Sequence, residues 1–187
     1  MGKKYRATTF LELIIYMSIT AILSAAAFVG YQNSKSNAKL AAAQAEVAST
    51  IKTAQNYALQ GKIQPGETVC GYGFGFVAGL EEYKIYYISL DRANFPDGCG
   101  EQNNDPAYRQ LHFGFYGIVE SYKLPEDVFL DNTATSISDT NIFFDIPNGN
   151  IYKEDGDPLN APVTIQFEIS GKTEKITLNE RGLITEN

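Results

Sequence analysis

The chain is poor in the residues on which most enzyme and metal sites depend. Its 187 residues include one histidine, His112, and two cysteines, Cys70 and Cys99. One histidine excludes a histidine cluster, and no Ser-His-Asp arrangement emerges from the sequence. Two cysteines and one histidine spread over about forty residues do not match a zinc site. We therefore expect a protein that is not an enzyme and needs no cofactor, in which His112 is either structural or simply exposed.

Positive charge is also scarce. The chain has 15 lysines and arginines and 22 acidic residues, which gives a net charge of −7 and a pI near 4.7. Lys3, Lys4 and Arg6 lie in the first seven residues, so removal of that stretch leaves 15 − 3 = 12 basic residues against 22 acidic ones, or −10. Because nonspecific affinity for nucleic acid scales with contacts from Lys and Arg, we expect no nucleic-acid partner.

An apolar run from about Leu13 to Val29 follows the basic residues. An ordinary secretory signal peptide would end in a small-x-small cleavage site and a break. Here the run has no proline and continues without interruption into a polar, strongly helical segment. Roughly 17 to 20 apolar or small residues are just enough to span a bilayer. Ser18, Thr20, Ser24 and the alanines 25–27 favour close packing against other helices as well as lipid. Glu12 stands at the entrance of this helix, where an ionised carboxylate without a partner costs about 2–3 kcal/mol.

The apolar pattern changes to an amphipathic one between about Ser36 and Gln60. Apolar residues recur there at steps of three and four, with polar residues between them: Leu40, Ala43, Val47, Ile51, Ala54 and Ala58. Gly61 is a suitable left-handed C-cap. The sequence predicts one continuous helix from Phe10 to Gln60, about 75 Å long at 1.5 Å per residue.

The rest of the chain alternates apolar and polar residues between turn signals, as β-strands do. Strands are predicted at Gly71–Val77, Glu82–Leu90, Leu111–Val119, Asn141–Ile146, Val163–Ser170 and Glu174–Asn179, with a hairpin turn at Ser170–Thr173. "GYGFGFV" superficially resembles a phosphate-binding glycine loop, but a strand with aromatic residues on one face explains it better. The predicted fold class is α+β, with one long helix whose second half packs on an antiparallel sheet.

Two candidate sites remain in this β-rich part. Because the chain looks exported, Cys70 and Cys99 predict one disulfide between loop or strand-end segments near the surface; two buried free thiols are the alternative. Cys99 lies in a long polar loop between Leu90 and Tyr108. Glu154, Asp155 and Asp157 surround Gly156 and are weak calcium candidates, since their spacing matches no defined calcium motif and acidic hairpin turns are common.

The N-terminus resembles the type III signal of type IV pilins and type II secretion pseudopilins. That signal is a short basic leader, then an apolar helix with Glu at the fifth position after the cleavage site. Taking Glu12 as that residue places cleavage between Ala7 and Thr8, where the family usually has Gly and Phe. The segments "ASTIKTAQNYALQGK" and "IFFDIPNGNIY…VTIQFEISGKTEKITLNERGLI" are similar to the H-type minor pseudopilins and FimT-like minor pilins.

The resemblance implies a pilin-like α+β fold with four parts: a leader (1–7), a transmembrane and assembly helix (8–31), an amphipathic helix packed on the sheet (32–60) and a β-rich head (61–187). It implies N-methylation of Thr8 and pairing of Glu12 with an N-terminal amine in the assembly. The implied partners are prepilin peptidase, other pilin or pseudopilin subunits, an inner-membrane assembly platform and membrane lipid. The implied location is the bacterial inner membrane, single-pass, with the head outside the cytoplasm, or a filament when assembled.

The implied function is that of a structural minor subunit of a type IV pilus or a type II secretion pseudopilus. Two alternatives stay open. One is a monomeric membrane-anchored module whose head binds an extracellular ligand, with Glu12 in the headgroup layer. The other is a DNA-uptake minor pilin, which the acidic charge and the C-terminal "NERGLITEN", with Arg181 as its one basic residue, disfavour.

Overall fold

The computed structural model describes residues 9–76, 81–104, 116–130, 141–146, 148–153 and 158–186. It begins with helix α1, Phe10–Gln60, which confirms the predicted helix. The chain separates into two compact units, with the boundary between Ala38 and Lys39. The helix ends as predicted at Gly61, whose φ is 60°. The amide of Gly61 donates to Ala58 O at 3.1 Å and that of Lys62 to Tyr57 O at 3.0 Å, which is the Schellman pattern.

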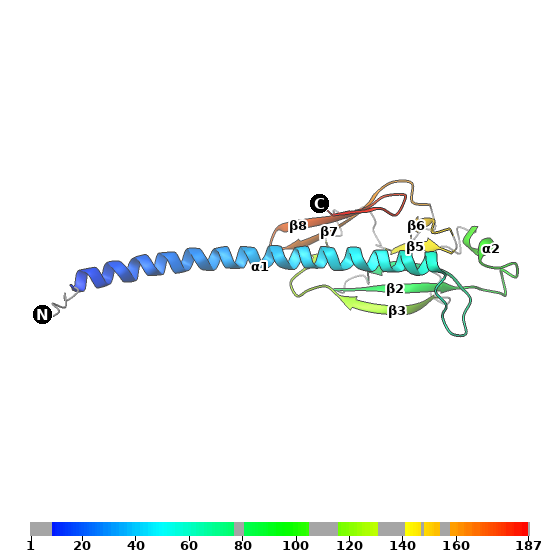
Figure 1. The fold of residues 1–187 in the computed structure, drawn as a ribbon, viewed down its shortest axis with the longest axis horizontal. Coiled ribbons are helices and arrows are strands. Elements are labelled where there is room, and N and C mark those ends of the chain that lie inside the picture. The colour runs from blue at the N-terminus through cyan, green and yellow to red at the C-terminus, as the bar shows by residue number, and fades with distance from the viewer. Residues whose placement is uncertain are drawn as a thin grey trace, which may run out of the picture. The chain divides into compact units, whose positions relative to one another are not determined.

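We call the second unit the head. Besides the part of α1 from Lys39 onward, its described residues form two antiparallel sheets and one short helix (Figure 1). The larger sheet has the order β3-β2-β1-β5-β6, with strands Tyr116–Lys123, Glu82–Ser89, Val69–Phe76, Asn141–Asp145 and Ile151–Lys153. The smaller sheet has the order β4-β7-β8-β9, with strands Phe129–Leu130, Val163–Ile169, Lys172–Leu178 and Ile184–Glu186. Helix α2, Cys99–Asn104, follows β2. The α+β class is confirmed, and the sheet expected from the sequence is divided into two.

The core of the head forms around the second half of α1. All six of the periodic apolar residues of the helix are buried: Leu40, Ala43, Val47, Ile51, Ala54 and Ala58. They belong to one cluster with Ile85 and Phe144 of the larger sheet and with Ile165 and Phe167 of the smaller one. Three of the six helix residues are alanines, which allow the helix backbone to approach the sheets closely. One helix face therefore holds both sheets together.

Strand β1 confirms the predicted alternation of aromatic and small residues. Tyr72 and Phe74 are fully buried in the main core. Gly73 lies on the opposite face, where a Cβ would overlap the ring of Tyr86. The glycines of "GYGFGFV" thus provide space for large side chains on neighbouring strands, and the segment is a strand rather than a phosphate loop.

Some predicted strand limits are wrong. β3 extends to Lys123 instead of ending at Val119, because Tyr122 pairs with Tyr83 and Lys123 forms an ion pair with Glu82 at 3.0 Å. Residues 111–115, which were expected to begin this strand, lie outside the described residues. The hairpin turn of the smaller sheet is limited to Ser170 and Gly171, with φ of 51° and 76°, as in a two-residue type I′ turn.

The polar loop predicted between Leu90 and Tyr108 contains α2, which the sequence pattern did not reveal. Side-chain amides anchor this segment. The side chain of Gln102 accepts from the amide of Asp91 at 2.8 Å and donates to Ser89 O at 3.1 Å. Asn103 donates to Cys70 O at 3.0 Å. Buried amide groups, rather than an apolar face, therefore hold this short helix, and hydrophobic periodicity does not report them.

Candidate functional site

The first unit exposes an apolar surface on α1. Large apolar side chains are exposed from Phe10 to Tyr31, among them Ile22 at 69% and Phe28 at 63%. Contiguous apolar surfaces of this kind are rare on monomers in water and mark contacts with membranes or proteins. The helix is long and apolar enough to cross a membrane, by length and composition. This confirms the coarse prediction of a single N-terminal segment that could serve as a membrane anchor.

Glu12 has partners within its own chain. The amide of Thr9 donates to Glu12 Oε2 at 3.0 Å, and the amide of Glu12 donates to Thr9 Oγ1 at 3.3 Å. These reciprocal bonds form a capping box, which satisfies two amides at the helix start. Sequence reasoning assigned Glu12 to pairing with an amine and missed this role, although Thr9-x-x-Glu12 is the usual signature of the box. The predicted cleavage residues, Ala7 and Thr8, lie outside the described residues.

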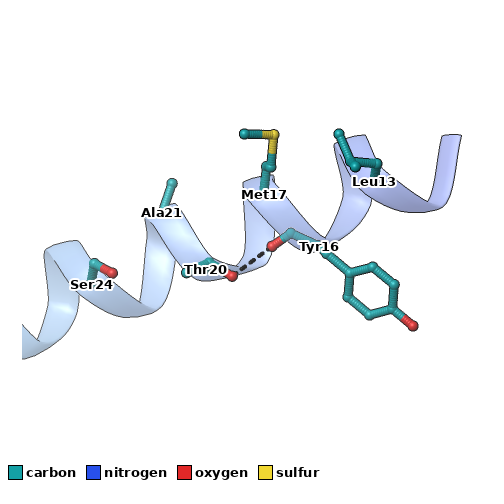
Figure 2. A pocket seen from close by; sticks show the side chains of 6 residues that line it. All are labelled: Leu13, Tyr16, Met17, Thr20, Ala21 and Ser24. Carbon is teal, nitrogen blue, oxygen red and sulfur yellow. Dashed lines mark hydrogen bonds between the residues drawn. The ribbon is translucent and has the colours of Figure 1, made fainter. Parts of the chain in front are cut away.

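The hydroxyl groups of the apolar segment bond to their own helix. Ser18 Oγ donates to Ile14 O at 2.8 Å, and Thr20 Oγ1 donates to Tyr16 O at 2.7 Å. A hydroxyl bonded in this way can lie in lipid without an unsatisfied donor. Thr20 helps to line a groove of about 460 Å³. Figure 2 shows the side chains around it. Its lining is Leu13, Tyr16, Met17, Thr20, Ala21 and Ser24. The small side chains of Thr20, Ala21 and Ser24, at one end of this groove, permit the close approach of another helix.

Cys70 and Cys99 form the predicted disulfide, with an S–S distance of 2.02 Å and a Cα–Cα distance of 5.0 Å. It joins β1 to the first residue of α2. The expectation that both cysteines lie near the surface is wrong for Cys70, which is completely buried because β1 is a central strand. The disulfide therefore fixes the segment 90–104 to the middle of the larger sheet.

A carboxylate with two phenol partners links α1 to β3. Tyr57 Oη donates to Glu120 Oε1 at 3.1 Å, and Tyr122 Oη donates to Glu120 Oε2. The hydrogen bond from Tyr122, followed by that from Tyr57, lowers the pKa of Glu120 against the opposing effect of burial. The same bond, with burial, raises the pKa of Tyr122 to about 12. Lys62 Nζ lies 3.4 Å from the ring centre of Tyr57. Sequence reasoning missed this cluster because its members come from separate elements.

The remaining predicted site residues are not brought together by the described structure. His112 and the weak calcium candidates Glu154, Asp155 and Asp157 lie outside the described residues. Across the described ranges, no group of three or more His, Cys, Asp or Glu side chains is arranged to hold a metal ion.

Comparison with known proteins gives no match: no family model fits the chain, and no curated protein or solved structure is significantly similar to it.

Proposed function

We propose that the chain is a prepilin-type protein, processed by prepilin peptidase and assembled as a minor subunit of a type IV pilus or a type II secretion pseudopilus. The observation that carries this proposal is the character of α1 along its length. Its first part exposes apolar side chains, and its second part is the core of a folded head. Such a helix suits a subunit whose apolar segment is surrounded by lipid before assembly. After assembly, the same side chains would pack against the helices of neighbouring subunits.

The distribution of charge supports an orientation. Lys3, Lys4 and Arg6 precede the apolar segment, and such residues stay on the cytoplasmic side of a membrane span. The head then lies outside the cytoplasm, where oxidising conditions allow disulfides to persist. The disulfide between Cys70 and Cys99 is consistent with this compartment.

Cleavage between Ala7 and Thr8 would create an α-amine one residue before Thr9, whose amide Glu12 already binds. The carboxylate is thus held beside the chain segment that would carry the new positive charge, with N-methylation at Thr8. An apolar assembly makes an unpaired carboxylate costly, so pairing of Glu12 with its own or a neighbour's amine would fix the register between subunits.

The mature N-terminus tests the proposal. Mass spectrometry of protein from cells with and without prepilin peptidase should show a start at Thr8, with or without a methyl group, only when the peptidase is present. An intact leader in both strains would contradict the proposal and leave a membrane-anchored head that binds a ligand as the better description.

A further inference from the structure

A second hollow, of about 500 Å³, lies in the head. We call it the seam pocket, because residues near both sheets line it. Gly149 and Asn150 come from the β5–β6 loop, and Glu180 and Arg181 come from the β8–β9 turn. The rest of the lining is β6 and the residues beside it: Ile151, Tyr152, Pro158 and Leu159. Its volume falls within the range of pockets that hold small molecules.

Hydrogen bonds fix the walls of the seam pocket. Asn150 donates its amide to Asp145 Oδ1 at 2.6 Å and its side-chain nitrogen to Asp145 Oδ2 at 3.0 Å. On the other wall, Asn179 Oδ1 accepts from the amides of Arg181 and Leu183 at 3.0 and 2.9 Å. A pocket with fixed walls loses little entropy when a ligand binds.

The helix also restrains the second wall. Gly182, with φ of 78°, brings the β8–β9 turn against Gln55 of α1, where a Cβ would overlap the glutamine side chain. The turn that carries Glu180 and Arg181 is therefore positioned by the core helix of the head.

The chemistry of the pocket changes from floor to rim. Three of the residues that line it, Ile151, Tyr152 and Leu159, are buried and form an apolar floor. Glu180 and Arg181 are exposed and carry opposite charges. Within the described ranges, neither charged group takes part in an ion pair. A rim with one carboxylate and one guanidinium suits a zwitterion, whereas a phosphate dianion would be repelled by Glu180.

We propose that the seam pocket binds a free α-amino acid with an apolar side chain. The carboxylate of the ligand pairs with Arg181, its ammonium group pairs with Glu180, and its side chain lies on the floor formed by Ile151 and Leu159. A guanidinium binds a carboxylate through two parallel hydrogen bonds, which orients the ligand. This binding activity is separate from assembly and does not depend on the proposed function.

The test uses the full chain in detergent micelles and L-leucine as the probe, followed by calorimetry and by the NMR shifts of the Gly149 and Gly182 amides. Leucine should bind saturably and shift both amides. 4-Methylpentanoate, which lacks the ammonium group, and 3-methylbutylamine, which lacks the carboxylate, should each bind at least about tenfold more weakly, because each loses one charge-assisted contact.

Arg181→Ala and Glu180→Gln should each weaken leucine binding by about tenfold without changing the melting temperature. Arg92→Ala and Glu67→Gln, which remove the same charges from exposed positions outside the pocket, should leave it unchanged. Absence of saturable leucine binding would overturn the proposal, as would equal binding of leucine and both analogues. Undiminished binding by Arg181→Ala would also overturn it.

Discussion

Tyr57 of α1 and Glu120 of β3 are joined by a hydrogen bond of 3.1 Å between the phenol and the carboxylate. Since Tyr122 donates to the other carboxylate oxygen, Glu120 ties the core helix to an outer strand of the larger sheet. This linkage makes the stability of the head depend on pH at both ends of the scale. At the acid end, the lowered pKa of Glu120 contributes stability above its ordinary value, and that stability is lost as the pH falls through the folded-state pKa.

At the alkaline end, Tyr122 gives the sharper prediction. Its pKa is raised from 10.0 to about 12, so its contribution is complete below pH 10 and is lost as the pH rises towards 12. The unfolding free energy of Tyr122→Phe, measured with urea at several pH values, should fall less steeply than that of wild type between these limits. Tyr31→Phe, on the exposed part of α1, is the matched control. Parallel slopes for Tyr122→Phe and wild type would contradict the assignment.

The disulfide should stabilise the head by constraining its unfolded state. Cys70 and Cys99 are 29 residues apart, and closure of a loop of about this length is worth roughly 3–4 kcal/mol in the chain-entropy model. Cys99→Ser breaks the bond without placing a hydroxyl in the core, because Cys99 is only partly buried while Cys70 keeps its buried thiol. We expect a loss of about 3 kcal/mol in urea unfolding.

Reduced wild-type protein is the control for this substitution and should unfold at the same urea concentration as Cys99→Ser. Hydrogen exchange should show faster exchange in α2 than in β1, since α2 keeps only its amide anchors, such as Asn103 to Cys70 O. A loss below about 1 kcal/mol would indicate that those anchors already order the segment in the reduced chain.

Much of this fold is predictable because its signals are local. Helix α1 follows from an unbroken apolar run, an amphipathic run and Gly61, and β1 follows from the alternation of glycine with Tyr72 and Phe74. The capping box was also visible as Thr9-x-x-Glu12. A charged Glu12 in an apolar segment also fits pairing with an amine, so the pattern alone does not single out the capping role.

The features that could not be predicted depend on contacts between distant segments. Strands β4, β6 and β9 have two or three residues, too few for a periodic pattern, and exist because neighbouring strands pair with them. The division into two sheets and the seam pocket likewise require knowledge of which turns meet. In the sequence, Glu180 and Arg181 look like part of an ordinary polar turn. Only the fold shows that they line the same pocket as Ile151.

Asp127 allows two opposing effects on stability to be compared: the cost of its left-handed backbone conformation and the gain from its ion pair with Lys39. Asp127 has φ of 68°, and Lys39 Nζ donates to its carboxylate at 2.9 Å and to Glu126 O at 2.8 Å. The Asp127 side chain is 68% exposed, so the ion pair is worth less than about 1 kcal/mol, whereas a left-handed conformation costs a residue other than glycine roughly 1–2 kcal/mol. Asp127→Gly should therefore stabilise the head slightly.

Asp127→Ala keeps the strain and loses the ion pair, so it should destabilise the head by less than about 1 kcal/mol. Asp127→Asn, which tolerates the left-handed region, should lie between the alanine variant and wild type. The order of urea midpoints distinguishes the two effects. If the glycine variant is the least stable of the three, the ion pair outweighs the backbone strain.

Glu12 offers a way to separate its capping role from its charge. Glutamine also serves as the fourth residue of a capping box, so Glu12→Gln keeps the bonds to Thr9 and removes the negative charge. Glu12→Ala removes both. If the charge pairs with an N-terminal amine, both variants should be processed at the leader but fail to enter a filament, as measured by shearing and by crosslinking between subunits.

Thr9→Val supplies the complementary change, because it keeps the charge of Glu12 and removes the hydroxyl that accepts from its amide. Loss of one cap costs about 1 kcal/mol at the helix start, and assembly of this variant should therefore be reduced less than that of Glu12→Gln. Glu67→Gln, at an exposed position of the head, controls for the change in net charge. Normal assembly of Glu12→Gln together with failure of Thr9→Val would reverse the interpretation: the carboxylate would then matter as a helix cap, and the register between subunits would have to come from the apolar side chains of α1.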